Sequence, residues 1–324
     1  MPEYLVTGAA GFIASKVCEF LLDEGNEVVG IDNMDPAYDL RLKRWRLSRL
    51  LPRRGFTFFE ESICDLQALE RIINNHANIQ AIINLAAKAG VRDSVIDPWA
   101  YYDTNLTGTL NLLELCRRHG IRKFILASTS SIYGQDAPYP TPEEAESSYP
   151  LQPYAASKKA AETLSYSYHY LYGTDISVVR YFTVYGPRQR PDMGINKFVT
   201  SNFEGKEIVI FGDGTQTRDF TYIDDAVYAN ILAANSDVSG EVFNIGGGNR
   251  ISVNDLIFVI EQATGRRAII RYTDKQKGDV IDTLADNSKA RRILGWEPRV
   301  DIRDGISHYV SWRKNLYQNQ GFHS

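Results

Sequence analysis

Short apolar runs alternate along about the first 185 residues of the chain with longer stretches in which charged and apolar residues mix. The apolar runs are typical of buried strands, and the mixed stretches favour amphipathic helices. Strands separated by helices form a parallel sheet that is covered by helices on both faces. The pattern therefore predicts a doubly wound α/β fold, with strands at 4–7, 27–31, 56–59, 81–86, 123–128 and 176–182.

Beyond about residue 186 the alternation weakens, and proline and glycine punctuate shorter, mixed segments. We expect a large first domain over 1–185 and a smaller α/β lobe that binds substrate over 186–324. The strand-like run EVFNIGG at 241–247 can rejoin the main sheet, so 219–250 is a candidate return to the first domain. Ligands of such sheets bind at the carboxyl ends of the strands, which places functional residues directly after each strand.

The composition narrows the class of protein. The 324 residues are 44% hydrophobic and 23% charged, which is typical of a globular chain, and no apolar run approaches a membrane span. The N-terminus begins directly with a strand, so we expect no signal peptide, and the three cysteines have no metal-ligand spacing. We expect a cytoplasmic protein without a metal, membrane or nucleic-acid partner.

A local basic cluster over 41–54 stands out against the formal net charge of −4. Such a run is usually one solvated face of a helix. The alternative is that it helps to attract an anionic ligand.

A glycine-rich turn and a carboxylate indicate a cofactor site. Gly8 and Gly11 stand in TGAAGFIAS, between the first strand and the first helix, where backbone N–H groups turn toward a diphosphate. Asp32 ends the second strand, where a carboxylate binds ribose hydroxyls and repels a 2′-phosphate. Together they predict a Rossmann domain that binds NAD rather than NADP.

A tyrosine and a lysine form a candidate catalytic pair. Tyr154 and Lys158 lie four residues apart in a helix-favouring segment, so their side chains share one face. A phenolate at neutral pH requires about 4 kcal/mol of stabilisation, which a nearby ammonium and the positive nicotinamide favour. The preceding strand ends in the hydroxyl run STSS, which includes Thr129. A hydroxyl, a tyrosine and a lysine together can deprotonate a substrate alcohol.

These segments resemble the extended short-chain dehydrogenase/reductases, and in particular their branch of nucleotide-sugar epimerases and dehydratases. The resemblance covers nearly the whole chain, and its motifs follow the order usual in that family. The matching stretches are TGAAGFIAS, NLAAKAGVRDS, STSSIYG, YAASK, VVRYFTVYGPRQRPDM, FGDGTQTRDFTYIDD and GDVIDTLAD.

The resemblance implies that Tyr154 is the general base, that Lys158 lowers its pKa and holds the nicotinamide ribose, and that Thr129 hydrogen-bonds the reacting sugar hydroxyl. The residues it implies for NAD are Gly8, Gly11, Phe12, Ile13, Asp32, Asn33, Ser62, Ile63, Leu85, Ala86, Ala87, Asn105, Tyr154, Lys158, Tyr181 and Phe182. Those it implies for the UDP-sugar are Lys88, Arg92, Ser130, Ser131, Thr183, Arg190, Asn196, Lys197, Phe198, Phe211, Arg218 and Asp279.

Two positions separate the chain from the lyases that it resembles. The 4,6-dehydratases carry an Asp–Glu pair directly after the catalytic threonine, because elimination of water needs a further acid and base. UDP-glucuronate decarboxylases usually keep a glutamate at the second position. Here Ser130 and Ser131 stand instead. The resemblance therefore favours a 4-epimerase, which oxidises C4 and returns the same hydride to the opposite face of the 4-keto sugar.

The substrate is predicted from a single position. Relatives that act on neutral UDP-hexoses commonly carry Asn where this chain has Thr183, and RYFTVYGPRQRP resembles the uronate epimerases. UDP-glucuronate and UDP-galacturonate are the expected pair. Because the 4-keto uronate is a β-keto acid, we expect Ser130, Ser131 and Thr183 to restrain its carboxylate against loss of CO₂.

Other functions stay open at this point. They are a UDP-glucose/galactose 4-epimerase, a UDP-glucuronate decarboxylase and a non-catalytic NAD-binding sensor. The segment around 98–118 and the helix of Tyr154 also resemble the four-helix interface of the family, which predicts a homodimer.

Overall fold

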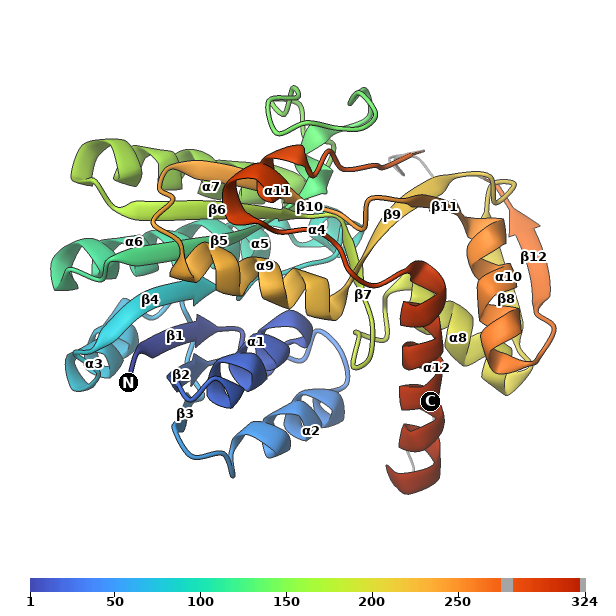
Figure 1. Ribbon diagram of the computed structural model, residues 1–324, viewed down its shortest axis with the longest axis horizontal. Coiled ribbons are helices and arrows are strands. Elements are labelled where there is room, and N and C mark those ends of the chain that lie inside the picture. Colours follow the sequence, from blue (N-terminus) through green and yellow to red (C-terminus); the bar gives the residue numbers. More distant parts are fainter. Residues whose placement is uncertain (275–281, 321–324) are drawn as a thin grey trace.

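The computed structural model describes residues 1–274 and 282–320. Seven strands form the main sheet in the order β10-β6-β5-β4-β1-β2-β3, and every neighbouring pair is parallel (Figure 1). The predicted doubly wound α/β fold is therefore confirmed. The strands are β1 (Glu3–Thr7), β2 (Glu27–Ile31), β3 (Phe56–Phe59), β4 (Ile79–Asn84), β5 (Lys123–Thr129), β6 (Asp175–Tyr181) and β10 (Glu241–Ile245).

The fourth strand lies two residues earlier than the predicted range 81–86. It ends at Asn84 because the chain turns away from the sheet there. The N–H groups of Leu85 and Ala86 donate to the Thr7 hydroxyl, at 3.1 and 3.0 Å, instead of to a neighbouring strand. The apolar run thus extends beyond the strand, and its last residues, Leu85 and Ala86, lie in the loop that follows.

Two helical layers cover the sheet, because successive strand side chains alternate between its faces. Val6 points into one core and Leu5 into the other. The first core packs against α1 (Phe12–Asp23) and α9 (Ile223–Asn235), and α2 (Leu40–Leu50) lies beside α1. The second core packs against α3 (Leu66–Asn75), α6 (Gly108–His119) and α7 (Pro153–Tyr172).

The basic helix α2 turns two of its cations inward. Lys43 and Arg46 are buried, whereas Arg41, Arg44 and Arg49 are exposed. The Arg46 guanidinium donates to the carbonyl oxygen of Ala10, at 3.1 Å. The interpretation of the basic cluster as a solvated helix face is therefore wrong for Lys43 and Arg46.

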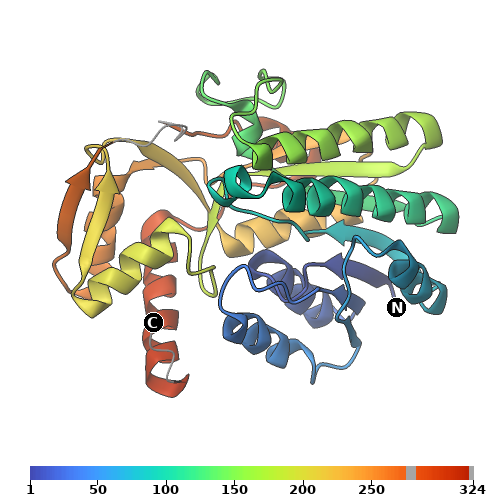
Figure 2. The ribbon, with the colours of Figure 1, turned by 180° about the vertical axis from the view of Figure 1, so that it is seen from behind.

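A smaller lobe lies beside the carboxyl edge of the main sheet (Figures 1 and 2). The chain enters it after β6, returns to the main sheet at β10, which pairs with β6 from Glu241 to Ile245, and then leaves again. The strands of the lobe are β7 (Thr183–Tyr185), β8 (Glu207–Phe211), β9 (Thr217–Tyr222), β11 (Arg250–Ser252) and β12 (Ile269–Thr273). Its helices are α8 (Gly194–Glu204), α10 (Val253–Thr264) and α12 (Ile302–Gln320). The helix α11 (Ser288–Leu294) packs instead against β10 and α9, on the side of the main sheet.

Short helical segments follow β4 and β5. They are α4 (Asp93–Ile96), α5 (Pro98–Tyr102), the π-helical turn η1 (Asp103–Thr107) and the 3₁₀ turn η2 (Ser130–Tyr133). Among the described residues, no helix is long and apolar enough to span a membrane.

Candidate active site

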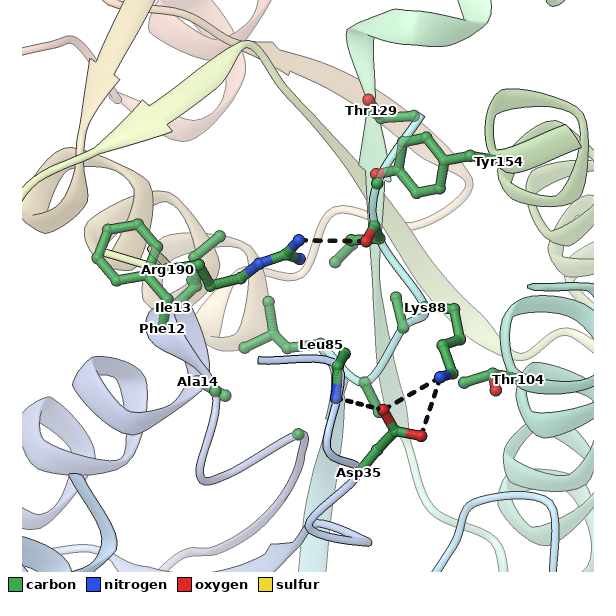
Figure 3. A pocket seen from close by; sticks show the side chains of 18 of the residues that line it. Phe12, Ile13, Ala14, Asp35, Leu85, Lys88, Thr104, Thr129, Tyr154 and Arg190 are labelled. Carbon is green, nitrogen blue, oxygen red and sulfur yellow. Dashed lines mark hydrogen bonds and ion pairs between the residues drawn. The ribbon is translucent and has the colours of Figure 1, made fainter. Parts of the chain in front are cut away.

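A cavity of about 470 Å³ opens at the carboxyl ends of β1, β2, β4, β5 and β6 (Figure 3). The sequence-predicted residues that line it are Gly8, Gly11, Phe12, Ile13, Asp32, Asn33, Ser62, Ile63, Leu85, Ala86, Ala87, Lys88, Thr129, Ser130, Ser131, Tyr154, Lys158, Tyr181, Phe182, Thr183 and Arg190. The fold thus brings together groups that lie up to 182 positions apart in the chain, from Gly8 to Arg190.

The turn between β1 and α1 has room for a diphosphate only because it carries glycines. Gly8 has a φ of +71°, and a Cβ there would lie 3.0 Å from the backbone of Ala86. A Cβ at Gly11 would lie 2.7 Å from the Gly8 carbonyl oxygen. Within the described residues, Gly11 caps α1 without a side-chain hydrogen bond, so the first N–H groups of the helix face the cavity as an anion site.

Asp32 is held in place by donors on three sides. Its carboxylate accepts the N–H of Ala10 at 3.1 Å and that of Met34 at 2.8 Å, and it pairs with Lys43 at 3.0 Å. An ionised carboxylate has about four acceptor sites, so one site is left for a ribose hydroxyl. Lys43 also lines the cavity and was not predicted as a site residue, because a run of cations does not show which α2 residues face inward.

The candidate catalytic side chains meet at the far end of the cavity. Thr129 is the last residue of β5, and Tyr154 and Lys158 lie one turn apart on α7. Both Thr129 and Tyr154 line this end of the cavity. The backbone N–H of Ser131 donates to Thr129 Oγ1, at 3.2 Å, which fixes that hydroxyl at the strand end.

Burial dominates the electrostatics of the pair. It raises the pKa of Tyr154, whereas the hydrogen bond with Thr129 and the charge of Arg190 act in the opposite direction. Burial also lowers the pKa of Lys158 to about 8, and the carboxylate of Glu162 opposes this shift. The protein groups alone therefore leave the phenol neutral. A further positive charge in the cavity is needed to favour the phenolate.

A buried ionic network supports this end of the cavity. Arg180 on β6 donates to both carboxylate oxygens of Glu162 on α7, at 3.0 and 2.8 Å. The Ser128 hydroxyl donates to Glu162 Oε1 at 2.5 Å, and Arg180 Nη1 donates to the Tyr133 hydroxyl at 2.8 Å. The network ties the strand end of Thr129 to the helix of Lys158. The network was not predictable from the sequence, because its members lie on separate elements.

The cavity continues into a second one of about 180 Å³ on the side of the smaller lobe. Ser130, Ser131 and Thr183 line both cavities. Arg92 and Arg218 line the second, which gives it cationic walls. The Arg92 guanidinium lies 5.1 Å from the ring centroid of Phe211. The two cavities therefore form one cleft that runs from the glycine turn to Arg218.

Three predicted residues hold the walls of the cleft. Arg190 donates to the carbonyl oxygen of Ala89 at 3.2 Å, which joins the smaller lobe to the loop after β4 (Figure 3). Asn105, in the π-helical turn η1, is buried behind that loop and bonds to Lys88 and Ser157. Lys88 pairs with Asp35.

Four predicted substrate residues, Asn196, Lys197, Phe198 and Phe211, are not among the described residues that line the two cavities. The first three are on α8. Asn196 is buried and donates to the carbonyl oxygen of Gln189 at 3.3 Å, Phe198 packs against the core, and Lys197 is exposed. Asp279 lies outside the described residues.

The fold and the cleft define the class of protein. The main sheet is a Rossmann sheet with a glycine-rich turn before α1 and a carboxylate, Asp32, at the end of β2. Together with the set of Thr129, Tyr154 and Lys158, this is the architecture of an extended short-chain dehydrogenase/reductase. A family model described as GDP-mannose 4,6 dehydratase matches residues 5–309, and the chain belongs to that family.

Several similar proteins are epimerases of UDP-sugars. A UDP-glucuronate 4-epimerase of Thermodesulfobacterium geofontis is 52% identical over 315 residues, which cover 97% of each chain. The crystal structure of a UDP-glucuronic acid 4-epimerase from Bacillus cereus, in complex with UDP-glucuronic acid and NAD, matches with a TM-score of 0.91 at 39% identity and covers 97% of this chain and 100% of that one. The crystal structure of a UDP-glucose 4-epimerase from Thermotoga maritima with UDP-glucose matches with a TM-score of 0.90 at 37% identity. The match covers 97% of this chain and 99% of that one.

Proposed function

We propose that this protein is an NAD-dependent 4-epimerase that interconverts UDP-glucuronate and UDP-galacturonate. The observation that carries the proposal is the convergence of Thr129, Tyr154 and Lys158 in a cavity that begins at the glycine turn. Ser130 and Ser131 line the same cavity at the positions where the lyases carry acids. The 52% identity with a UDP-glucuronate 4-epimerase supports the same substrate.

The residues of the chain suit a proton transfer at C4 of the sugar. Tyr154 takes the proton of the C4 hydroxyl, and Thr129 holds that hydroxyl by hydrogen bonding. NAD, when bound, supplies the hydride acceptor and the positive charge that the phenolate needs. The Gly8 to Gly11 turn and Asp32 would hold its diphosphate and adenine ribose. Lys158 would hold the nicotinamide ribose.

The second cavity suits the nucleotide half of the substrate. Arg92 and Arg218 provide cationic walls for a diphosphate. Ser130, Ser131 and Thr183 lie between this cavity and Tyr154, where the sugar would sit. Their three hydroxyls can donate to the sugar carboxylate and keep it from aligning for loss of CO₂.

The proposal is tested by comparing an acidic and a neutral sugar nucleotide. Purified protein is incubated with UDP-glucuronate or with UDP-glucose, with and without added NAD⁺, and the products are followed by proton NMR. We expect UDP-galacturonate from the first and little conversion of the second. Faster conversion of UDP-glucose would support the second candidate, a UDP-glucose 4-epimerase. That candidate is favoured by the likeness to the Thermotoga maritima enzyme.

A homodimer is also proposed, through the outer faces of α5, α6 and α7. Large apolar side chains are exposed there, among them Trp99, Tyr166 and Tyr170, with exposed fractions of 80%, 64% and 76%. Patches of this kind usually bind protein. The molar mass in solution tests the proposed dimer. We expect the mass of a dimer for the wild type and that of a monomer for Tyr170→Arg.

We further place the protein in the cytoplasm. Its three cysteines are free thiols, which a reducing compartment maintains.

A further inference from the structure

An ion pair joins two loops across the cofactor end of the cleft (Figure 3). Lys88 Nζ lies 2.9 Å from Asp35 Oδ2 and 3.1 Å from Asp35 Oδ1. Both residues line the 470 Å³ cavity, and their side chains are 30% and 28% exposed. The pair therefore lies at the boundary between the cavity and solvent.

The topology of the sheet fixes what this ion pair crosses. Asp35 follows β2 and Lys88 follows β4, and β1 lies between those two strands. Neighbouring strands are about 4.8 Å apart, so the two loops flank the glycine turn after β1 at a separation of about 10 Å. A dinucleotide on a Rossmann sheet runs across these strand ends, with its diphosphate at the turn. A bridge between the flanking loops must then pass over its middle.

Both ends of the bridge are anchored. The backbone N–H of Lys88 donates to Asn105 Oδ1 at 2.9 Å, and Asn105 Nδ2 donates back to the Lys88 carbonyl oxygen at 3.0 Å. Asn105 Nδ2 also donates to Ser157 on α7, at 2.9 Å. On the other side, Asp35 Oδ1 accepts the N–H of Ala37 at 2.9 Å. These hydrogen bonds hold the two loops in positions where the Lys88 and Asp35 side chains can pair.

We propose that Lys88 and Asp35 form a strap that closes over the bound dinucleotide and slows its release. This inference rests on the proposed use of NAD and gives Lys88 a role at the cofactor rather than at the sugar. An ion pair with partial exposure is weak, so it opens readily and changes the rate of release rather than deciding whether NAD binds.

The test measures release of labelled NAD from the holoenzyme after a chase with excess unlabelled NAD. Lys88→Gln and Asp35→Asn each remove the ion pair, and each is expected to release NAD three- to tenfold faster than the wild type. Lys88→Asp places two carboxylates together and should be faster still. The double variant Lys88→Asp with Asp35→Lys restores the pair in reverse and should return the rate to within about twofold of the wild type.

A matched control uses the ion pair of Lys16 with Asp224, which joins α1 and α9 at 3.3 Å. Neither residue is among the described residues that line the cavity. Lys16→Gln should therefore leave the release rate unchanged.

A direct bond from Lys88 to the diphosphate would give a different pattern. Lys88→Gln would then speed release, Asp35→Asn would not, and the reversed pair would fail to restore the rate. That pattern, or an unchanged rate in both single variants, overturns the strap. Because the assay needs only bound NAD, a protein that binds NAD but does not epimerise UDP-glucuronate would refute the proposed function and leave this test intact.

Discussion

The two ends of the cleft are built from different kinds of sequence. At the cofactor end, Gly8, Gly11 and Asp32 lie within 25 residues of one another and act through backbone geometry and one carboxylate. At the sugar end, Arg92, Thr183 and Arg218 come from three separate loops and strands, and only tertiary packing brings them together. The first end is therefore specified locally, and the second by the fold as a whole.

Substitutions at the two ends of the cleft should therefore act differently. A side chain added at Gly8 or Gly11 meets backbone atoms that cannot move far, so its effect on NAD binding should be close to all-or-none. A change at the sugar end removes one of several polar side chains around a larger space, so it should alter selectivity and product distribution. Tyr154 lies between the two ends, and its replacement should slow the chemical step with little effect on NAD binding.

The largest effect is expected from Tyr154→Phe, which removes the proposed base. General acid–base catalysis contributes about 10²- to 10⁴-fold, so kcat on UDP-glucuronate should fall by about 10³-fold. The amount of NAD bound per chain should remain that of the wild type. Tyr272→Phe, at an exposed tyrosine on β12 outside the cleft, serves as the control. Normal turnover in Tyr154→Phe would remove Tyr154 from the mechanism.

Gly8→Ala tests the rigidity of the cofactor end. Its Cβ would lie 3.0 Å from the Ala86 backbone, at a φ of +71°. Gly25→Ala has a similar φ of +79°, but its Cβ meets no atom of the described structure within 4 Å. Both changes should cost about 1 to 2 kcal/mol of stability through the left-handed backbone. Only Gly8→Ala should also lose NAD, measured as cofactor content after gel filtration. Equal NAD content in both variants would contradict a close-fitting turn.

We expect Asp219, on β9 beside Arg218, to make the stability of the protein depend on pH. Burial raises the pKa of this carboxyl from 3.8 to about 6. The folded state therefore binds the proton more tightly than the unfolded state, and stability is lost as pH rises from about 4 to about 6. At about 1.4 kcal/mol per pH unit, the loss approaches about 3 kcal/mol.

Asp219→Asn removes this titration and is the comparison to measure. The free energy of unfolding of the wild type minus that of the variant, from urea titrations, should fall between about pH 4 and pH 7. A difference that is constant across this range would show that Asp219 does not titrate there.

The smallest effect is expected from Thr183→Ala at the sugar end. It removes one of three hydroxyls placed to hold the sugar carboxylate, and a charge-assisted hydrogen bond is worth about 1.5 to 3 kcal/mol. We expect a several-fold rise in CO₂ and UDP-pentose relative to UDP-galacturonate. Thr183→Ser keeps the hydroxyl and should keep the product ratio. An unchanged ratio in a folded Thr183→Ala protein would count against this restraint.

The sequence predicted those parts of the site that depend on short-range geometry. The glycine turn follows from its place between a strand and a helix, and Tyr154 with Lys158 follows from the spacing of one helical turn. The six strands up to residue 182 were also predictable, because buried parallel strands are continuously apolar.

Features set by tertiary contacts were not predictable. The inward turn of Lys43 depends on the rotation of α2 about its axis, which a run of cations does not reveal. The pairing of Arg180 with Glu162 depends on how α7 packs on β6. Asn196 was expected at the sugar, but α8 places it against Gln189, because the start of the helix at Gly194 decides which face is buried.

Transient oxidation at C4 is tested most directly with UDP-glucuronate that carries deuterium at C4 of the sugar. If the hydride leaves and returns within one active site, proton NMR will show UDP-galacturonate that retains the deuterium at C4, with little CO₂ released. Loss of the deuterium to solvent, or UDP-pentose as the main product, would contradict a 4-epimerase that works by hydride return.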